Sequence, residues 1–191
     1  ISLPARAIRV APGVETRPMP GGRYLHVGAS LCGGWSYAYL CGFFRQAVRE
    51  IGGVELEAGE VYARMAALVE RTGETALAVD PRFAGSRDDP ARRGNIGGIG
   101  ERNLTPGDLA CAFLDGMVNE LAELAGESDR AAVRSLVATG NAARRNPALL
   151  PRIERRFGLP CRLAAHQEEA ALGAAAGVVR HGRRVLAAVG Q

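Results

Sequence analysis

The chain has 191 residues, of which 47% are hydrophobic and 23% charged, and its formal net charge is +4. This length and composition fit one globular domain with a substantial buried core and exclude wholesale disorder. The charge is carried mostly by arginine in scattered pairs interleaved with acids, and aromatic residues make up only 5%. The pattern is typical of solvated helix faces, so we expect no nucleic-acid partner.

The four cysteines are widely spaced and form no Cys-x-x-Cys pair. That spacing suits neither a zinc cluster nor a disulfide framework and favours buried free thiols in a reducing, cytoplasmic setting. The sequence shows no signal-peptide pattern and no apolar run of membrane length, so we expect no membrane partner.

In the first third of the chain, the sequence predicts a strand over residues 4–10, then a loop rich in proline and glycine, then a strand over Tyr24–Gly28. A helix is expected over Trp35–Arg49, and a second over Ala58–Arg71. In the second helix, apolar residues recur at helical spacing.

A short strand is expected at Leu77–Val79, followed by a segment rich in glycine, arginine, aspartate and proline over residues 80–104. A loop of that length is often functional, and we expect a hairpin strand at Asn95–Ile99 to interrupt it.

The start of a helix is predicted by Thr105, Pro106 and Asp108. Thr is a preferred N-cap, Pro suits the first helical position, and Asp at the third position completes a pattern like a capping box. The helix has an apolar stripe formed by Leu109, Phe113, Leu114, Met117, Leu121 and Leu124.

Beyond this helix, the pattern alternates: a strand at 134–139, a helix at 147–157, a strand at 161–164 and a helix at 167–180. The last apolar piece, 185–189, is compatible with a strand or a frayed helix. Alternation of this kind predicts an α/β fold in which the two strands are parallel.

Two linked segments in this region predict a nucleotide site. Leu136–Pro147 reads as a short apolar strand, a glycine turn and a polar loop that opens a helix, and Glu168–Ala175 reads as a helix with many small residues. A strand that stops at glycine where a helix starts can admit a phosphate, ribose or base edge without a side chain in the way.

Read together, the motifs resemble the C-terminal half of the FGGY carbohydrate kinases, members of the actin-like ATPase superfamily. Val27–Ser30 resembles the second phosphate-contacting turn of that family, and Phe83–Ile99 resembles its glycine- and arginine-rich loop. Thr105–Glu120 resembles the long helix after that loop. Thr139–Pro147 resembles the adenosine motif, and Glu168–Ala175 resembles the closing helix.

The resemblance covers residues from about 22 to 180 and is strongest to the sedoheptulokinase branch of the family. That branch is indicated by the form Ala-Thr-Gly-Asn…Arg-Asn-Pro and by Ala29–Leu31 followed by Gly33–Gly34. Two departures stand out. Many members have two or three consecutive glycines where this chain has Gly140 alone, and many have glutamate where this chain has Ser86.

The resemblance implies an α/β fold of the ribonuclease-H-like (actin-like ATPase) type, a mixed sheet flanked by helices. Residues 1–191 would be the single C-terminal nucleotide-binding lobe of a two-lobed sugar kinase. The N-terminal sugar-binding lobe, its expected partner, is absent from the chain. The reaction implied is phosphoryl transfer from ATP with Mg²⁺ to a ketose such as sedoheptulose.

That activity places the catalytic base and most sugar contacts in the absent lobe, so the chain alone is expected to be inactive. We assign no catalytic residue and no metal ligand within it. The sequence leaves the oligomeric state open, with a homodimer among the assemblies considered.

For the triphosphate, the resemblance implies contacts from Gly28, Ala29 and Ser30 through backbone N–H groups and the serine hydroxyl. Gly98 would line the same cleft, where a side chain would crowd the phosphates or ribose. The structural alternatives are a plain strand-to-helix turn for the first three residues and a hairpin glycine for Gly98.

For the nucleoside, Gly140 and Asn141 would meet the ribose and α-phosphate, and Asn146 would face adenine, because an amide can both donate to and accept from its edge. The alternative for Asn146 is an N-cap followed by Pro147 at the first helical position.

Two other functions stay open on the sequence alone. One is a non-catalytic actin-like module that binds nucleotide. The other is an α/β interaction domain without a nucleotide site, in which every glycine serves a turn.

Overall fold

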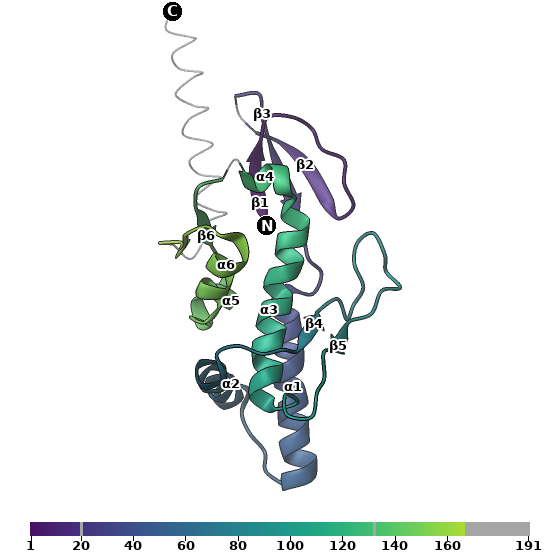
Figure 1. The fold of residues 1–191 in the computed structure, drawn as a ribbon, viewed down its shortest axis with the longest axis vertical. Coiled ribbons are helices and arrows are strands. Elements are labelled where there is room, and N and C mark those ends of the chain that lie inside the picture. Colours follow the sequence, from purple (N-terminus) through teal and green to yellow (C-terminus); the bar gives the residue numbers. More distant parts are fainter. Residues whose placement is uncertain (20, 132, 167–191) are drawn as a thin grey trace, which may run out of the picture.

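The computed structural model describes residues 1–19, 21–131 and 133–166. Figure 1 shows helix α3 (Pro106–Ala125) running through the length of the molecule, with an antiparallel sheet near its C-terminal end and α2 near its N-terminal end. The other helices are α1 (Gly33–Gly52), α2 (Ala58–Thr72), α4 (Glu127–Ala131), α5 (Asn141–Arg145) and α6 (Leu149–Phe157). The strands are β1 (Ser2–Ala5), β2 (Val14–Met19), β3 (Arg23–Gly28), β4 (Ala78–Asp80), β5 (Asn95–Gly97), β6 (Leu136–Ala138) and β7 (Cys161–Leu163).

The described strands form three small sheets. β3 lies between β1 and β2 and is antiparallel to both, while β4 and β5 form an antiparallel pair. β6 and β7 are parallel, and the chain between them forms α5 and α6, as a parallel pair requires a crossover. Together they give the mixed α/β arrangement that the sequence predicts.

The start of α3 follows from its sequence. The Thr105 hydroxyl accepts a hydrogen bond from the Asp108 N–H at 3.1 Å, and Pro106 occupies the first turn, where its missing N–H costs nothing. The Thr105 hydroxyl in turn donates to the Asp108 carboxylate at 2.5 Å. The predicted cap is therefore confirmed, and it fixes where the central helix begins.

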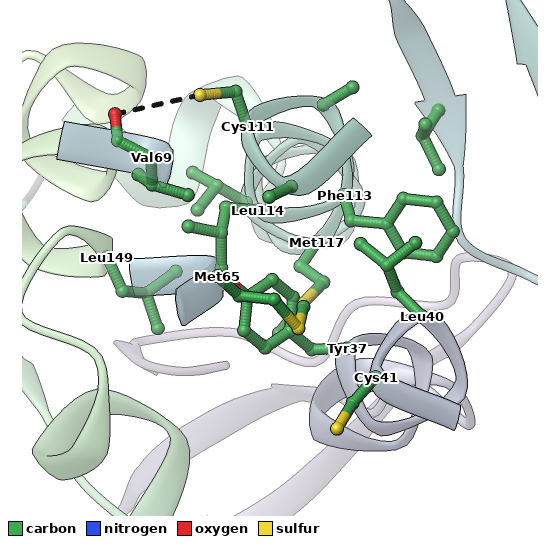
Figure 2. Packing of buried hydrophobic residues seen from close by; sticks show 14 of the residues in the cluster. Tyr37, Leu40, Cys41, Met65, Val69, Cys111, Phe113, Leu114, Met117 and Leu149 are labelled. Carbon is green, nitrogen blue, oxygen red and sulfur yellow. Dashed lines mark hydrogen bonds between the residues drawn. The ribbon is translucent and has the colours of Figure 1, made fainter. Parts of the chain in front are cut away.

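The core is built where α1, α2 and α3 meet (Figure 2). Its buried side chains come from α1 (Tyr37, Leu40, Cys41), α2 (Val61, Met65, Val69), α3 (Cys111, Phe113, Leu114, Met117, Val118) and the α5–α6 segment (Ala143, Leu149). Burial of this apolar surface is the main force that holds the helices together.

Gly116 lets α3 lie directly on β4. A Cβ at this position would stand 2.3 Å from the Val79 carbonyl oxygen, so no other residue fits without moving the strand. This close approach places the segment that follows β4 against the start of α1, which bears on the site described below.

Several predicted elements are confirmed with small shifts of their ends. They are the strand at Tyr24–Gly28, the helices at Trp35–Arg49 and Ala58–Arg71, the hairpin strand near residue 95, and the parallel pair of strands at 134–139 and 161–164. The predicted helix at 167–180 and the last piece at 185–189 lie outside the described residues.

Two predictions for the elements were wrong. The first strand covers Ser2–Ala5 and not residues 4–10, and the supposed loop after it contains β2. The pairing of β2 with β3 outweighs the weak strand propensity of Val14–Met19, and Pro18 is tolerated because β2 is an edge strand. The helix expected at 147–157 is confirmed and begins two residues later, at Leu149, after a separate short helix, α5.

The four cysteines are free, as expected, and three of them are buried, whereas Cys161 is partly exposed. Within the described part of the chain, no helix has the length and apolar character needed to cross a membrane.

Candidate functional site

A cavity of about 530 Å³ opens between α1, α2, α3 and the α5–α6 segment. Most of its wall is apolar or small. The lining residues are Gly34 and Tyr37 from α1, Gly59, Tyr62, Ala63 and Ala66 from α2, Leu114 and Met117 from α3, and Asn141, Ala142, Arg145, Asn146 and Leu149 from the α5–α6 segment. A concave, largely apolar cavity with a few polar groups is the usual form of a small-molecule site.

Asn146 supplies the most informative polar atom of this cavity. Its side chain is only 8% exposed, and its Oδ1 atom accepts no hydrogen bond from the described residues. A buried acceptor without a donor costs free energy, so native proteins rarely keep one without a reason. The cavity beside Asn146 leaves room for a ligand donor to reach that atom.

The structure also excludes the capping role considered for Asn146. Helix α6 begins only at Leu149, its N-cap is Ala148, and no side chain caps it. The Asn146 backbone carbonyl accepts from the Leu149 N–H at 3.0 Å, so only its main chain serves the turn. The side-chain amide of Asn146 therefore caps no helix and can interact with a ligand in the cavity.

Tyr37 reaches the same cavity from α1. Its ring is 9% exposed and packs in the core shown in Figure 2, while its hydroxyl makes no hydrogen bond within the described residues. Burial raises the pKa of Tyr37 to about 12, although a polar interaction between its hydroxyl and the Asn146 side chain opposes the shift. The two side chains are therefore neighbours at the cavity, but not in the geometry of a good hydrogen bond. Tyr37 is therefore a neutral phenol at physiological pH and can both donate and accept.

The turn before α5 gives this side of the cavity an open backbone. Gly140 has φ +87°, a conformation that other residues rarely adopt, and within the described part of the chain no atom beyond its two sequence neighbours lies within 4 Å of where its Cβ would stand. Gly34 lines the same cavity, and a Cβ there would stand 3.8 Å from the Cβ of Ala142, at van der Waals contact. The starts of α1 and α5 therefore meet at the wall of the cavity.

The second predicted contact, the turn at Gly28–Ser30, lies elsewhere. The Gly28 N–H donates to the Ile1 carbonyl at 2.9 Å, and the Gly28 carbonyl accepts from the Ile1 amino group at 2.7 Å. Both polar groups of Gly28 are thus used in the sheet. In this conformation the Gly28 amide is not available to a phosphate.

The Ser30 hydroxyl is also engaged within the chain. It donates to the Glu120 carboxylate at 2.7 Å and accepts from the N–H groups of Cys32 and Gly33, each at 3.0 Å. Ser30 therefore holds the start of α1 against α3. Glu120 is 5% exposed, and burial raises the pKa of its carboxyl.

Ala29 lines a second, smaller cavity of about 140 Å³, whose wall carries charged side chains of both signs. These include Arg82, whose guanidinium lies 3.0 Å from the Glu123 carboxylate, together with Glu120. The charges of this wall are largely satisfied by one another.

Gly98 lines neither of these two cavities. It has φ +72°, and a Cβ there would stand 2.6 Å from the Ala76 carbonyl oxygen. The hairpin of β4 and β5 therefore accounts for this glycine by itself.

The structure thus brings Asn141 and Asn146 together at one cavity, with Gly140 at the turn before them, and places the other predicted contacts apart from it. The roles of all seven residues in nucleotide binding stay predictions. Sequence reasoning missed Gly34, Tyr37 and Tyr62 as cavity residues, because only tertiary packing places α1 and α2 opposite α5. Across residues 1–19, 21–131 and 133–166, no group of three or more His, Cys, Asp or Glu side chains is arranged to hold a metal ion.

Comparison with known proteins identifies the family of the chain. Residues 4–179 match the profile of the C-terminal domain of the FGGY family of carbohydrate kinases, so the chain belongs to that family. It is 29% identical over 159 residues to the sedoheptulokinase of Homo sapiens, covering 82% of this chain and 33% of that protein. It is likewise 29% identical over 154 residues to the sedoheptulokinase of Mus musculus, covering 80% of this chain and 32% of that protein.

Among solved structures, the xylulose kinase from Bifidobacterium adolescentis superposes with a TM-score of 0.64 at 22% identity, covering 84% of this chain and 30% of that one. This likeness establishes the fold, the actin-like ATPase architecture that the sequence predicts. The chain spans about a third of the length of the curated relatives that it matches. The predicted family and fold are confirmed.

Proposed function

We propose that this member of the FGGY family forms the C-terminal, nucleotide-binding lobe of a two-lobed sugar kinase, with residues 1–191 as one unit. The family match and the short span relative to the curated relatives support this division. The N-terminal lobe would hold the catalytic base and most sugar contacts. The family match favours the kinase interpretation over a non-catalytic module.

The nucleoside of ATP is proposed to occupy the large cavity. The observation that carries this assignment is the buried Oδ1 atom of Asn146, which has no hydrogen-bond partner among the described residues and belongs to a side chain that lines a largely apolar cavity. The exocyclic amino group of adenine is a hydrogen-bond donor that would satisfy this acceptor, and its flat ring suits walls formed by Tyr37, Tyr62 and Met117. The residues present therefore fit the nucleotide.

The turn at Gly140 and Asn141 is proposed to lie against the ribose and α-phosphate. Its glycine conformation keeps side chains away from the ligand, and the Asn141 side chain is positioned at the cavity wall. Arg145 lines the same cavity, and its positive charge would favour a phosphate.

The triphosphate would extend from the cavity toward the absent lobe. Gly28, Ala29, Ser30 and Gly98 remain our predicted contacts for it. Because the Gly28 amide and the Ser30 hydroxyl already have partners, Ala29 is the part of that turn best able to contribute. Mg²⁺ is proposed to arrive with ATP, held mostly by phosphate oxygens and water.

When bound, MgATP supplies the phosphoryl group for transfer to a sugar hydroxyl. What this lobe contributes is position: the walls of α1, α2 and α3 exclude water from the base, and Asn146 fixes its orientation. Phosphoryl transfer depends mainly on positioning and charge neutralisation. A lobe that positions the nucleotide would therefore supply a main part of the catalysis.

The acceptor is proposed to be a ketose of the sedoheptulose type. Both curated relatives reported above are named sedoheptulokinase. That name refers to a ketose sugar. The acceptor would reach the phosphate through the absent lobe.

The test is an ADP-release assay of the full-length protein with MgATP and a panel of ketoses and aldoses. The proposal expects ketose-dependent turnover whose KM for ATP rises about a hundredfold in Gly140→Val and stays unchanged in the surface control Asn119→Ala. ATP turnover that is indifferent to every sugar, or a KM for ATP unchanged in Gly140→Val, would contradict it.

A further inference from the structure

The hydrogen bonds of Ser30 leave its side chain with no capacity for a ligand. A serine hydroxyl has one donor and two acceptor positions, and here the donor is used by Glu120 and both acceptor positions by the Cys32 and Gly33 amides. Ser30 therefore acts as a cap for α1, and Glu120 fixes the direction in which that cap points.

Glu120 lies at a buried position, where a carboxylate lowers the stability of the fold unless it has a partner. It lies on α3 and is 5% exposed, and a buried carboxyl costs free energy unless it is hydrogen-bonded. The positive charge of Arg82 favours the carboxylate, whereas the negative charges of Asp80 and Glu123 oppose it. The partner of Glu120 within hydrogen-bond distance is the Ser30 hydroxyl.

The cap leads directly to the large cavity. The residue after the capped Gly33 amide is Gly34, which lines the cavity wall where α1 comes close to Ala142. Ser36, one turn on, is fully buried and donates to the carbonyl oxygens of Cys32 and Pro81. The start of α1 is thus fixed from both sides, by α3 through Glu120 and by the segment after β4 through Ser36.

We propose that Glu120 is a positioning residue for nucleotide binding, which acts through Ser30 to hold the first turn of α1 as one wall of the nucleoside cavity. The inference rests on the proposed function of that cavity. It replaces direct contact between the Ser30 hydroxyl and phosphate with an indirect role. Glu120 itself touches no ligand.

The experiment compares kinetic constants of the full-length protein for four variants. Glu120→Leu removes the acceptor at similar volume, and Glu120→Gln keeps an oxygen that can accept the same bond. Ser30→Ala removes the cap, and Ser30→Thr keeps the hydroxyl. Glu60→Leu and Glu60→Gln are matched controls, because Glu60 is exposed on α2 and pairs only with Arg64 among the described residues.

The expected result is a KM for ATP raised about tenfold in Glu120→Leu and in Ser30→Ala, the effect of losing one charge-assisted hydrogen bond. The KM for the sugar and kcat should stay within about threefold, because the sugar site and the chemistry lie elsewhere. Glu120→Gln and Ser30→Thr should restore a KM for ATP close to that of the wild type. The double variant Ser30→Ala/Glu120→Leu should be no worse than either single one.

Three results would overturn the inference. A KM for ATP unchanged in both Glu120→Leu and Ser30→Ala would show that the cap does not position the cavity. A loss in Ser30→Ala about a hundredfold greater than in Glu120→Leu would indicate direct phosphate contact by Ser30. Parallel changes in both KM values, kcat and the midpoint of thermal unfolding would indicate a general defect of folding.

If Glu120→Leu does not fold, Ser30→Ala and Ser30→Thr decide the question alone. The proposed function fails separately, when the wild-type protein shows no ATP-dependent turnover of any sugar. If the wild-type protein does turn over a sugar with ATP, but the KM for ATP is unchanged in the Glu120 and Ser30 variants, only the positioning role is rejected.

Discussion

The two turns predicted to contact nucleotide, Gly28–Ser30 and Gly140–Asn146, use their polar groups in opposite ways. In the first turn, the polar groups form hydrogen bonds within the protein: Gly28 pairs with Ile1, and Ser30 bonds to Glu120 and to the start of α1. The second turn leaves the Asn146 Oδ1 atom buried and without a partner at the edge of a cavity.

The difference shows what a glycine next to a small polar residue can and cannot indicate. Both turns join a strand to a helix, and both have glycine beside a hydrogen-bonding side chain, so the sequence treats them alike. A full account of hydrogen-bond partners separates them, because a ligand can bind only where donors or acceptors remain unused. The comparison predicts that Gly28→Ala mainly lowers stability and that changes at Gly140 and Asn146 act directly on binding. Ser30 is expected to affect binding only indirectly, through the first turn of α1.

The largest expected effect is in the second turn. Gly140→Val places a β-branched residue at φ +87° and adds methyl groups where the ligand approaches. We expect the affinity for MgATP to fall about a hundredfold, because the turn must distort to relieve the strain. Calorimetric titration of the full-length protein measures the affinity.

The same variant should lose only about 1–2 kcal/mol of unfolding free energy, since no atom of the described residues, apart from its sequence neighbours, lies within 4 Å of the new Cβ. Urea unfolding measures this loss. Binding that persists at wild-type strength would remove the turn from the site.

The opposite pattern, a loss of stability with little change in affinity, is expected for Gly28→Ala. The new Cβ would stand 2.6 Å from the Leu124 Cβ and 3.3 Å from Ile1, so the sheet must shift away from α3. We expect a loss of about 2 kcal/mol in unfolding free energy, typical of overpacking, measured by urea unfolding. The affinity for MgATP should change little, and a severe loss of affinity in a stably folded variant would assign this turn to the ligand after all.

Asn146→Ala tests the role of a single atom, the side-chain oxygen of Asn146. The variant removes the proposed contact with the base, and we expect the affinity for MgATP to fall about tenfold. Stability should be unchanged or slightly higher, because an unpartnered buried carbonyl disappears with the side chain. Thermal unfolding and calorimetry together measure the two effects, and the exposed Asn119→Ala serves as the control.

The smallest effect concerns Tyr37 and pH. Its pKa of about 12 in the folded protein lies above the ordinary value near 10, so the folded state favours the neutral phenol. The stability that this provides is fully present below pH 10 and is lost as the pH rises toward 12. We expect Tyr37→Phe to reduce the loss of unfolding free energy between pH 9 and pH 11 by about 1 kcal/mol.

Unfolding by urea at the two pH values measures the difference between wild type and variant. The half-exposed Tyr39 on the same helix provides the matched control as Tyr39→Phe. An equal pH dependence in wild type and Tyr37→Phe would mean that Tyr37 is solvated in the folded protein.

Local sequence determines much of this fold. The Thr105 cap, Pro106 and the apolar stripe of α3 identify the central helix without any tertiary information, since each feature acts within a few residues. The parallel pair β6 and β7 follows from the alternation of strand and helix patterns. Family resemblance supplied the architecture that periodicity alone leaves open.

What the sequence could not indicate depends on distant partners. β2 is a strand because β3 lies beside it, and a stretch with proline and charged residues carries no strong strand signal. Glu120 is only one acidic residue on a long helix until Ser30, 90 positions away, is found against it. Tyr37 reads as a core residue in sequence, and its place at a cavity becomes evident only when α5 is set opposite α1.

The most direct test of the account is a crystal structure of the full-length protein with a non-hydrolysable ATP analogue and Mg²⁺. We predict that the base lies in the cavity between α1, α2 and α5, with its exocyclic amino group within hydrogen-bond distance of the Asn146 Oδ1 atom and the bonds between Ser30 and Glu120 intact. A base seated elsewhere, with this cavity empty and the Gly28–Ser30 turn opened around phosphate, would contradict it.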